Sequence, residues 1–215
     1  MKVRIACIVL SAALLGVPSA FGVSLRGVDV NPGLVMVFTT DPLAAPSPIV
    51  ATIGASMPID ITDLFFVEPA IDVFGVNYRY TDTRAVPATM EAGDGFFTAC
   101  ILIGAQAGAR YPLTKVLEIG GTVGADFLIR FPLELVNTGA ESVADRDPSL
   151  EYFYGALRFI YPETRVFLRW QVVEQLGLVF SVRAFYPIFH IWDGENLPFL
   201  DQLMIAGSLG FSIRF

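Results

Sequence analysis

The last stretch of the chain, from Met204 to Phe215, alternates between two kinds of side chain. One set of alternate positions is apolar and ends in aromatic residues: Ile205, Gly207, Leu209, Phe211, Ile213 and Phe215. The other set is small or polar and ends in a cation: Ala206, Ser208, Gly210, Ser212 and Arg214. A period of two residues is typical of a β-strand with unlike faces. A strand that closes a membrane barrel has this pattern, because its outer residues contact lipid and its end lies at the aromatic girdle.

The composition agrees with a membrane barrel better than with membrane helices. Hydrophobic residues make up 54% of the 215 residues, charged residues make up 16%, and the mean hydropathy is +0.60. After residue 22 no run of about 18 uncharged apolar residues occurs, which is the length that a membrane-spanning helix needs. A closed barrel is the other structure that satisfies its backbone inside lipid. The net charge of −7 and the lack of a Lys/Arg cluster argue against nucleic acid as a partner.

The N-terminus has the pattern of a secretory signal peptide. Lys2 and Arg4 precede an apolar stretch from Ile5 to Leu15, and small residues at Ala20 and Gly22 indicate cleavage after Gly22. The alternative, a short membrane anchor, is disfavoured because the apolar stretch is too short to span a bilayer. We therefore predict a signal peptide over 1–22 and one barrel domain over 23–215. Cys100 is then the one cysteine of the mature chain, which excludes an internal disulfide and indicates a sequestered thiol.

Further segments alternate in the same way, most clearly Leu117 to Phe131. The predicted strands are 33–40, 49–57, 65–80, 97–110, 117–131, 150–161, 176–190 and 204–215. A change of polarity near Val76 predicts a bulge or the point where that strand leaves the bilayer. The segment 162–175 also alternates, and we expect it to extend a neighbouring strand through a bulge at Pro162, with a turn at Glu174 and Gln175.

The eight strands predict an all-β fold, an eight-stranded antiparallel up-and-down transmembrane β-barrel. Long connections (41–48, 81–95, 132–149 and 192–200) alternate with shorter ones (58–64, 111–115 and 162–175). In such barrels the long loops face outside and the short turns face the periplasm. Both termini are then expected in the periplasm, and the polar loop 132–149 is the best candidate for a partner-binding surface.

The closing strand also carries a family resemblance. Leu209, Phe211, Ile213 and Phe215 match the terminal strand of small bacterial outer-membrane β-barrels, which ends in Phe and is recognised by the assembly machinery. Together with the signal peptide and the strand rhythm, the chain resembles the eight-stranded barrels of the OmpW and OmpA type. The resemblance implies a cell outer-membrane location, with outer-membrane lipid and the barrel-assembly machinery as partners. It also implies a small hydrophobic molecule as a candidate ligand, as for OmpW-like proteins.

Charged residues in the predicted strands occupy the positions opposite to the apolar face. They are Glu68, Asp72, Arg110, Glu118, Asp126, Arg130, Arg158, Arg183 and Arg214. A charge on the lipid face costs about 2–4 kcal/mol at mid-depth, so we expect these side chains in the lumen. An eight-stranded barrel is narrow enough for side chains to fill it, which favours an ion-pair plug over an open lumen that passes or holds a small ligand.

The remaining candidate groups for chemistry are few. His190 is the one histidine, and a Ser-His-Asp site with Ser181 and Asp193 would need all three within hydrogen-bonding distance. We favour an interfacial role for His190 and predict no catalytic site, metal or cofactor. Aromatic residues near the strand ends form either interfacial belts or an apolar ligand mouth. They are Tyr78, Tyr80, Phe96, Phe97, Tyr186, Phe189, Trp192 and Phe199.

The function that these features predict is that of a non-catalytic integral outer-membrane barrel, either structural and surface-exposed or a narrow conduit for small or hydrophobic molecules. One alternative is a membrane-embedded lipid-modifying enzyme that uses His190. The other is a soluble lipocalin-like ligand-binding barrel. The second alternative requires the apolar faces of the strands to point inward and the charged faces to point outward.

Overall fold

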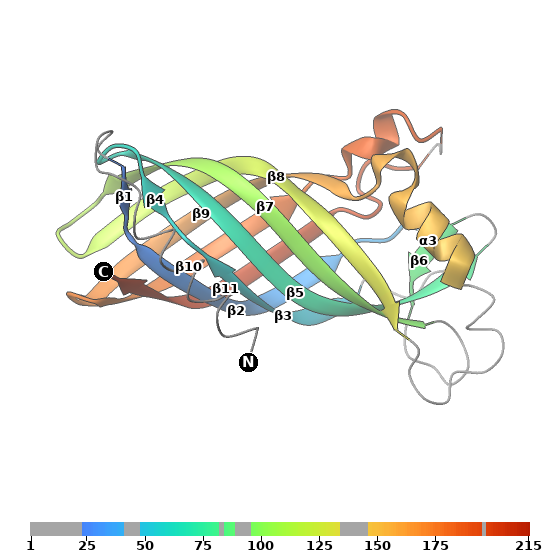
Figure 1. The fold of residues 1–215 in the computed structure, drawn as a ribbon, viewed down its shortest axis with the longest axis horizontal. Coiled ribbons are helices and arrows are strands. Elements are labelled where there is room, and N and C mark those ends of the chain that lie inside the picture. The colour runs from blue at the N-terminus through green and yellow to red at the C-terminus, as the bar shows by residue number, and fades with distance from the viewer. Residues whose placement is uncertain (1–22, 41–47, 82–83, 89–95, 134–145, 195–196) are drawn as a thin grey trace, which may run out of the picture.

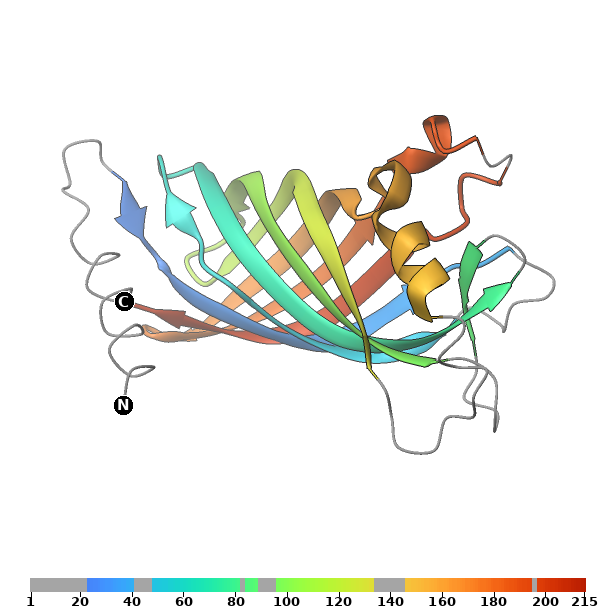
Figure 2. The same cartoon turned by 45° about the vertical axis from the view of Figure 1, so that its right-hand side comes forward.

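The computed structural model describes residues 23–40, 48–81, 84–88, 96–133, 146–194 and 197–215. Within these residues, eight long strands form one antiparallel sheet that closes as a barrel (Figures 1 and 2). The strands are β2 (Gly27–Val37), β3 (Ile49–Ser56), β5 (Phe65–Thr81), β7 (Phe96–Pro112), β8 (Leu117–Leu133), β9 (Ile160–Val173), β10 (Leu176–Phe185) and β11 (Met204–Arg214). Each pairs with the next along the chain. The pairing of β11 with β2 completes the predicted eight-stranded barrel.

The two faces of the strands differ as the alternation predicts. On β8, the outward side chains of Ile119, Val123, Phe127 and Phe131 are 40% to 61% exposed, whereas the charged residues between them point inward. The outward side of β11 likewise exposes Ile205, Leu209, Phe211 and Ile213. The outer wall of the closed sheet is therefore apolar along both strands. A lipocalin-like barrel needs the opposite arrangement of the two faces, so the structure does not support that alternative.

The segment 150–161 is not the predicted strand. It forms helix α3 (Arg146–Tyr154) and the 3-10 turn η2 (Gly155–Leu157), and β9 begins at Ile160. The segment 160–173 takes the place of the missing strand, with a turn at Glu174 and Gln175 as expected. No bulge interrupts β9 at Pro162, which pairs in register with Ala125. The register shift lies between Leu176 and Gly177 instead.

Two strand boundaries and one expected irregularity also differ from the prediction. β2 begins at Gly27 instead of residue 33, because Asp29 and Asn31, which precede the predicted strand, are lumen-facing strand residues. β5 pairs with β7 without interruption through Tyr78, so there is no bulge near Val76. The change of polarity in β5 reflects a change in the lumen, which becomes apolar there. β10 ends at Phe185, and the 3-10 turn η3 (Ile188–Ile191) follows it.

The two ends of the barrel are built differently. The C-terminus lies at the end with the short turns, where β1 (Ser24–Leu25) pairs with β4 (Ile59–Asp60) (Figure 1). The opposite end carries β6 (Arg84–Pro87), α3, η2 and η3. We call the described residues 84–88, 146–159 and 186–203 the cap. No helix in the described part of the chain is long and apolar enough to cross a membrane.

Candidate functional site

The predicted lumen residues are buried in most cases. Six inward strand residues have exposed fractions of 9% or less: Glu68, Asp72, Arg110, Asp126, Arg130 and Arg183. The Glu118 side chain is 13% exposed, and Arg214 is half-buried near the end of β11. Arg158 is also buried, but it follows η2 and belongs to the cap, because the strand expected around it is not formed. The predicted charged residues of the barrel interior therefore lie on strands, whereas Arg158 lies in a loop of the cap.

The first layer of charges lies near the short turns and joins β9 to β2 and β8. Arg169 donates to Asp29 at 2.5 Å and to Glu118 at 2.9 Å. Glu118 also accepts from Arg26 at 2.7 Å. Beside them, Arg110 pairs with Asp60 of β4 at 2.6 Å. These contacts place arginine side chains, whose planar guanidinium groups can bind two carboxylates at once, across the end of the barrel that carries the short turns.

The second layer crosses the middle of the barrel. Arg183 of β10 pairs with Asp72 of β5, and its Nε donates to Glu163 of β9 at 2.6 Å. Arg165 of β9 pairs with Glu68 of β5. The amide of Gln106 donates to Glu163 at 2.7 Å and to Asp126 at 3.4 Å. Because β5 and β10 are four strands apart around an eight-stranded barrel, the Arg183–Asp72 pair spans the lumen.

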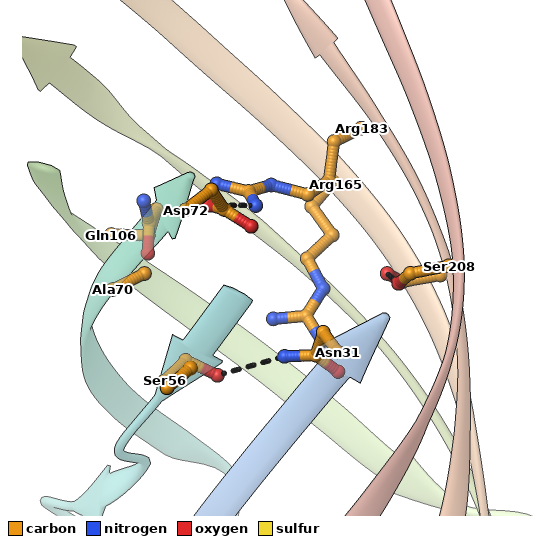
Figure 3. A pocket seen from close by; sticks show the side chains of 10 residues that line it. Asn31, Ser56, Ala70, Asp72, Gln106, Arg165, Arg183 and Ser208 are labelled. Atoms are coloured by element: carbon orange, nitrogen blue, oxygen red, sulfur yellow. Dashed lines mark hydrogen bonds and ion pairs between the residues drawn. The ribbon is translucent and has the colours of Figure 1, made fainter. Parts of the chain in front are cut away.

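The space that remains in this layer is small. Figure 3 shows the cavity, into which the Arg165 side chain extends toward Asn31 and Ser56. Its volume is about 10 Å³, near the minimum for the centre of one water molecule. On its β10–β11 side, the hydroxyl groups of Ser181 and Ser208 lie 2.7 Å apart. At this level the lumen is filled by side chains and does not form an open channel.

The third layer, toward the cap, is apolar. Its buried side chains come from the strands and from the cap: Val35, Val37, Phe74, Val76, Tyr78, Phe96, Cys100, Leu102, Leu128, Tyr152, Phe153, Tyr161, Phe185, Phe189, Met204 and Ala206. Arg130 is the cation within it, donating to the Tyr161 hydroxyl at 3.0 Å, with its guanidinium 4.8 Å from the centre of the Phe153 ring. Phe153 of α3 and Phe189 of η3 are 1% and 0% exposed, so the cap closes this end of the barrel.

The aromatic residues near the strand ends lie in three environments, and Tyr80, Phe97 and Tyr186 are half-buried. Tyr78, Phe96 and Phe189 are buried in the apolar layer and form neither an interfacial belt nor an open mouth. Trp192 and Phe199 are about half exposed on the cap. Sequence alternation could not separate the buried rings from the exposed ones, because Tyr78 and Phe96 face an apolar part of the lumen and Phe189 is buried from a cap segment without strand structure.

A polar network joins the cap segments around Asp201. Its carboxylate accepts from the backbone N–H of Thr40 at 2.8 Å and pairs with Arg84 of β6 at 3.4 Å. Nδ1 of His190 lies 3.0 Å from the Asp193 carboxylate, and Nε2 lies 2.8 Å from the carbonyl oxygen of Asp201. These contacts tie η3 and β6 to the segment before β11, so the cap is a packed part of the fold.

The same contacts bear on the suggested Ser-His-Asp site. His190 and Asp193 are hydrogen-bonded, but the second ring nitrogen of His190 contacts the main chain of Asp201. Ser181 bonds to Ser208 inside the barrel. The three side chains therefore do not form the chain of hydrogen bonds that the triad mechanism needs. Among the described residues, no cluster of three or more His, Cys, Asp or Glu side chains could hold a metal ion.

The four residues of the predicted assembly signal lie on the outer surface. Leu209, Phe211 and Ile213 are 46% to 49% exposed on β11, and Phe215 is 80% exposed just after it. The backbone N–H of Phe215 still donates to the carbonyl of Arg26 at 3.2 Å. The last residue is therefore held against the neighbouring strand while its ring faces outward.

Comparison with known proteins places the fold. No protein-family model and no curated protein matches the chain. Among solved structures, Neisserial surface protein A is 14% identical, with a TM-score of 0.55 over 90% of this chain and 99% of that one. Ail of Yersinia pestis is 9% identical, with a TM-score of 0.48 over 89% and 98%. The N-terminal β-barrel domain of Pseudomonas aeruginosa OprF is 11% identical, with a TM-score of 0.40 over 89% and 100%. At these identities the likeness concerns the fold alone, and the match to Neisserial surface protein A supports the barrel.

Proposed function

We propose that the chain is an integral outer-membrane β-barrel whose role is structural and surface-exposed. The observation that carries this proposal is the outer wall, where apolar side chains such as Leu34, Val123, Val166 and Phe180 are 47% to 63% exposed. Exposure of this apolar surface to water is unfavourable, whereas contact with lipid is favourable. The charged side chains, which would be costly in lipid, lie inside the barrel. The fold shared with Neisserial surface protein A, named as a surface protein, agrees with this assignment.

The filled lumen favours a structural barrel over a conduit. Two layers of ion pairs and one apolar layer succeed one another along the axis, and the cavity of the middle layer is about 10 Å³. A solute would have to break buried ion pairs to pass. The same packing gives no support to an OmpW-like site for a small hydrophobic molecule, because Phe153 and Phe189 occupy the apolar end of the lumen.

The remaining parts of the proposal concern delivery and partners. A signal peptide over 1–22, cleaved near Gly22, would direct export, and these residues lie outside the described part of the chain. The exposed face of Leu209, Phe211, Ile213 and Phe215 is available to the barrel-assembly machinery. Outer-membrane lipid would surround the barrel, and we propose no nucleic-acid partner. The occupied ring nitrogens of His190 favour a non-catalytic protein over a lipid-modifying enzyme.

Membrane fractionation and conductance test the proposal together. The full chain is expressed in cells with an outer membrane, and the folded protein is identified by its heat-dependent migration on gels. We expect it in the outer-membrane fraction, and the purified barrel should give no conductance steps in planar bilayers. Recovery in the soluble fraction would overturn the membrane assignment. Steady conductance by the unaltered protein would overturn the sealed barrel and support the conduit.

A further inference from the structure

Besides Phe199 and Leu200, the cap exposes four large apolar side chains on or next to α3, η2 and η3, although it has a packed interior. Tyr154 at the end of α3 is 40% exposed and Leu157 of η2 is 49% exposed. Ile191 of η3 is 78% exposed, and Trp192 after it is 46% exposed. We call these four residues the cap patch. A water-facing loop gains nothing from such a group of side chains, so the cap patch indicates a contact surface.

The backbone holds part of the cap patch in an unfavourable conformation. Ala156 and Leu157 have φ angles of 47° and 58°, in the left-handed region that residues with a Cβ rarely adopt. Two consecutive residues of this kind cost energy that the surrounding contacts must offset. One such contact is the indole N–H of Trp192, which donates to the carbonyl of Ala156 at 2.7 Å. The strained turn keeps Leu157 pointing outward and places Trp192 beside it.

The cap patch is continuous with the outer wall of the barrel. The Tyr154 hydroxyl accepts from the backbone N–H of Arg130 at 3.1 Å and donates to its carbonyl at 2.9 Å, on the part of β8 that extends beyond its pairing with β9. The Tyr154 ring lies 6.1 Å from Phe159, and Phe159 stacks on Phe127 at 6.3 Å. Phe127 is an outward residue of β8 and is 50% exposed. A connected row of rings thus leads from the lipid-facing wall to the cap.

We infer that the cap patch is a loop-borne membrane anchor that rests in the interfacial region of the outer leaflet beside β8. This inference rests on the proposed function. Tyr and Trp are enriched at membrane interfaces, where an apolar ring lies at headgroup level and its polar group has a partner, here the main chain, and Leu157 and Ile191 add apolar area. The row of ring contacts from Phe127 to Tyr154 favours lipid over a protein partner. The lipid that contacts Phe127 on the barrel wall would extend to Tyr154 in the cap patch. The anchor would hold the cap closed over the apolar end of the lumen.

The two tryptophans of the chain allow a direct test. Trp170 lies on the outer face of β9 near the short turns, and Trp192 lies in the cap patch. The variant Trp170→Phe reports on Trp192 alone, and the matched variant Trp192→Phe reports on Trp170 alone. Each is reconstituted in vesicles of phospholipids brominated near the headgroup end of their chains. We expect each indole to lose about half of its emission, since both would lie at a membrane interface.

The outcomes separate the inference from the proposed function. In one outcome brominated lipid quenches Trp170 but not Trp192, and aqueous acrylamide quenches Trp192. This result would leave the membrane barrel intact and overturn the anchor in favour of a protein-binding surface. Loss of quenching at both positions would overturn both. Adding Ile191→Asp to Trp170→Phe gives a second test, in which quenching of Trp192 by brominated lipid should fall at least twofold. Unchanged quenching in that variant would mean that the cap patch does not act as a unit.

Discussion

Arg183 on β10 and Asp72 on β5 form an ion pair across the barrel, between strands four positions apart in the closed sheet. Both residues are buried, and Glu163 is a second partner of Arg183, with its Oε1 2.6 Å from the arginine Nε. The pair connects opposite walls in the middle of the lumen (Figure 3). It therefore combines two roles, since it neutralises buried carboxylates and blocks the axis.

Replacing Arg183 should destabilise the barrel strongly. Arg183→Met keeps the apolar stem of the side chain but leaves Asp72 and Glu163 buried without the guanidinium group, which we expect to cost about 3 kcal/mol or more. The measurement is urea unfolding in detergent micelles or vesicles, followed by tryptophan emission. Lys115→Met is the matched control, because Lys115 is exposed in a turn and its loss should cost less than about 0.5 kcal/mol. Equal small effects for both variants would show that the ion pair contributes little.

The glycine at position 54 makes room for Asp72. A Cβ on Gly54 would lie 2.0 Å from Oδ1 of Asp72 and 3.2 Å from the carbonyl oxygen of Ile71. Gly54→Ala should therefore displace the Asp72 carboxylate from Arg183 and lower stability by about 1–3 kcal/mol. Gly207→Ala on the outer face is the control, because a Cβ there meets nothing within 4 Å. The same unfolding assay compares them, and a tolerated Gly54→Ala would contradict the geometry of the pair.

A charge on the outer wall should be costly only within the membrane. Val123 is 61% exposed near the middle of β8, and Val116 is 50% exposed in the turn before that strand. Val123→Arg is expected to lower the free energy of unfolding in vesicles by about 2–4 kcal/mol, whereas Val116→Arg should lower it by less than about 1 kcal/mol. If the two arginines had equal effects, the lipid-facing position of Val123 would be wrong.

Removal of the terminal ring should affect assembly more than stability. Phe215 is 80% exposed, so Phe215→Ala removes little packing and should change the free energy of unfolding by less than about 0.5 kcal/mol. The assembled fraction in cells, measured by heat-dependent gel migration, should nevertheless fall several-fold if the machinery reads this residue. Leu113→Ala, in the exposed turn after β7, is a control that should not alter assembly. Normal assembly of Phe215→Ala would remove the support for a terminal signal.

The alternation of side chains was sufficient to predict the barrel because lipid and lumen impose opposite demands on neighbouring residues. That demand is clear along β8 and β11, whose predicted boundaries agree with the structure within two residues. It weakens where the lumen itself is apolar. In β5 the inward residues Phe74, Val76 and Tyr78 carry no polarity signal, so a regular strand was interpreted as having a bulge or as leaving the bilayer near Val76.

The cap was beyond what alternation could predict. Tyr152 and Phe153 are adjacent in sequence, and both are buried because α3 presents them to the barrel end, which a strand could not do. The Asp147–Pro148 pair at the start of α3 was the one available signal, since proline and an acidic residue favour the first turn of a helix. The ion-pair partners Asp29, Glu163, Arg165 and Arg169 were missed for a related reason. Asp29 lies before the first predicted strand, and the other three lie in the stretch 162–175, which was not assigned a strand of its own.

Thiol accessibility tests the central claim that the barrel has a lipid-facing wall and a filled lumen. Single cysteines are placed at Val123, Thr122 and Glu151 in a Cys100→Ala background, and the protein is studied in intact cells. Val123 faces outward, Thr122 is buried inward with 4% exposure, and Glu151 is exposed on α3. We expect a membrane-impermeant reagent to label Glu151→Cys, a lipid-soluble reagent alone to label Val123→Cys, and neither to label Thr122→Cys readily. Rapid labelling of Val123→Cys by the impermeant reagent, in protein extracted without detergent, would contradict the membrane barrel.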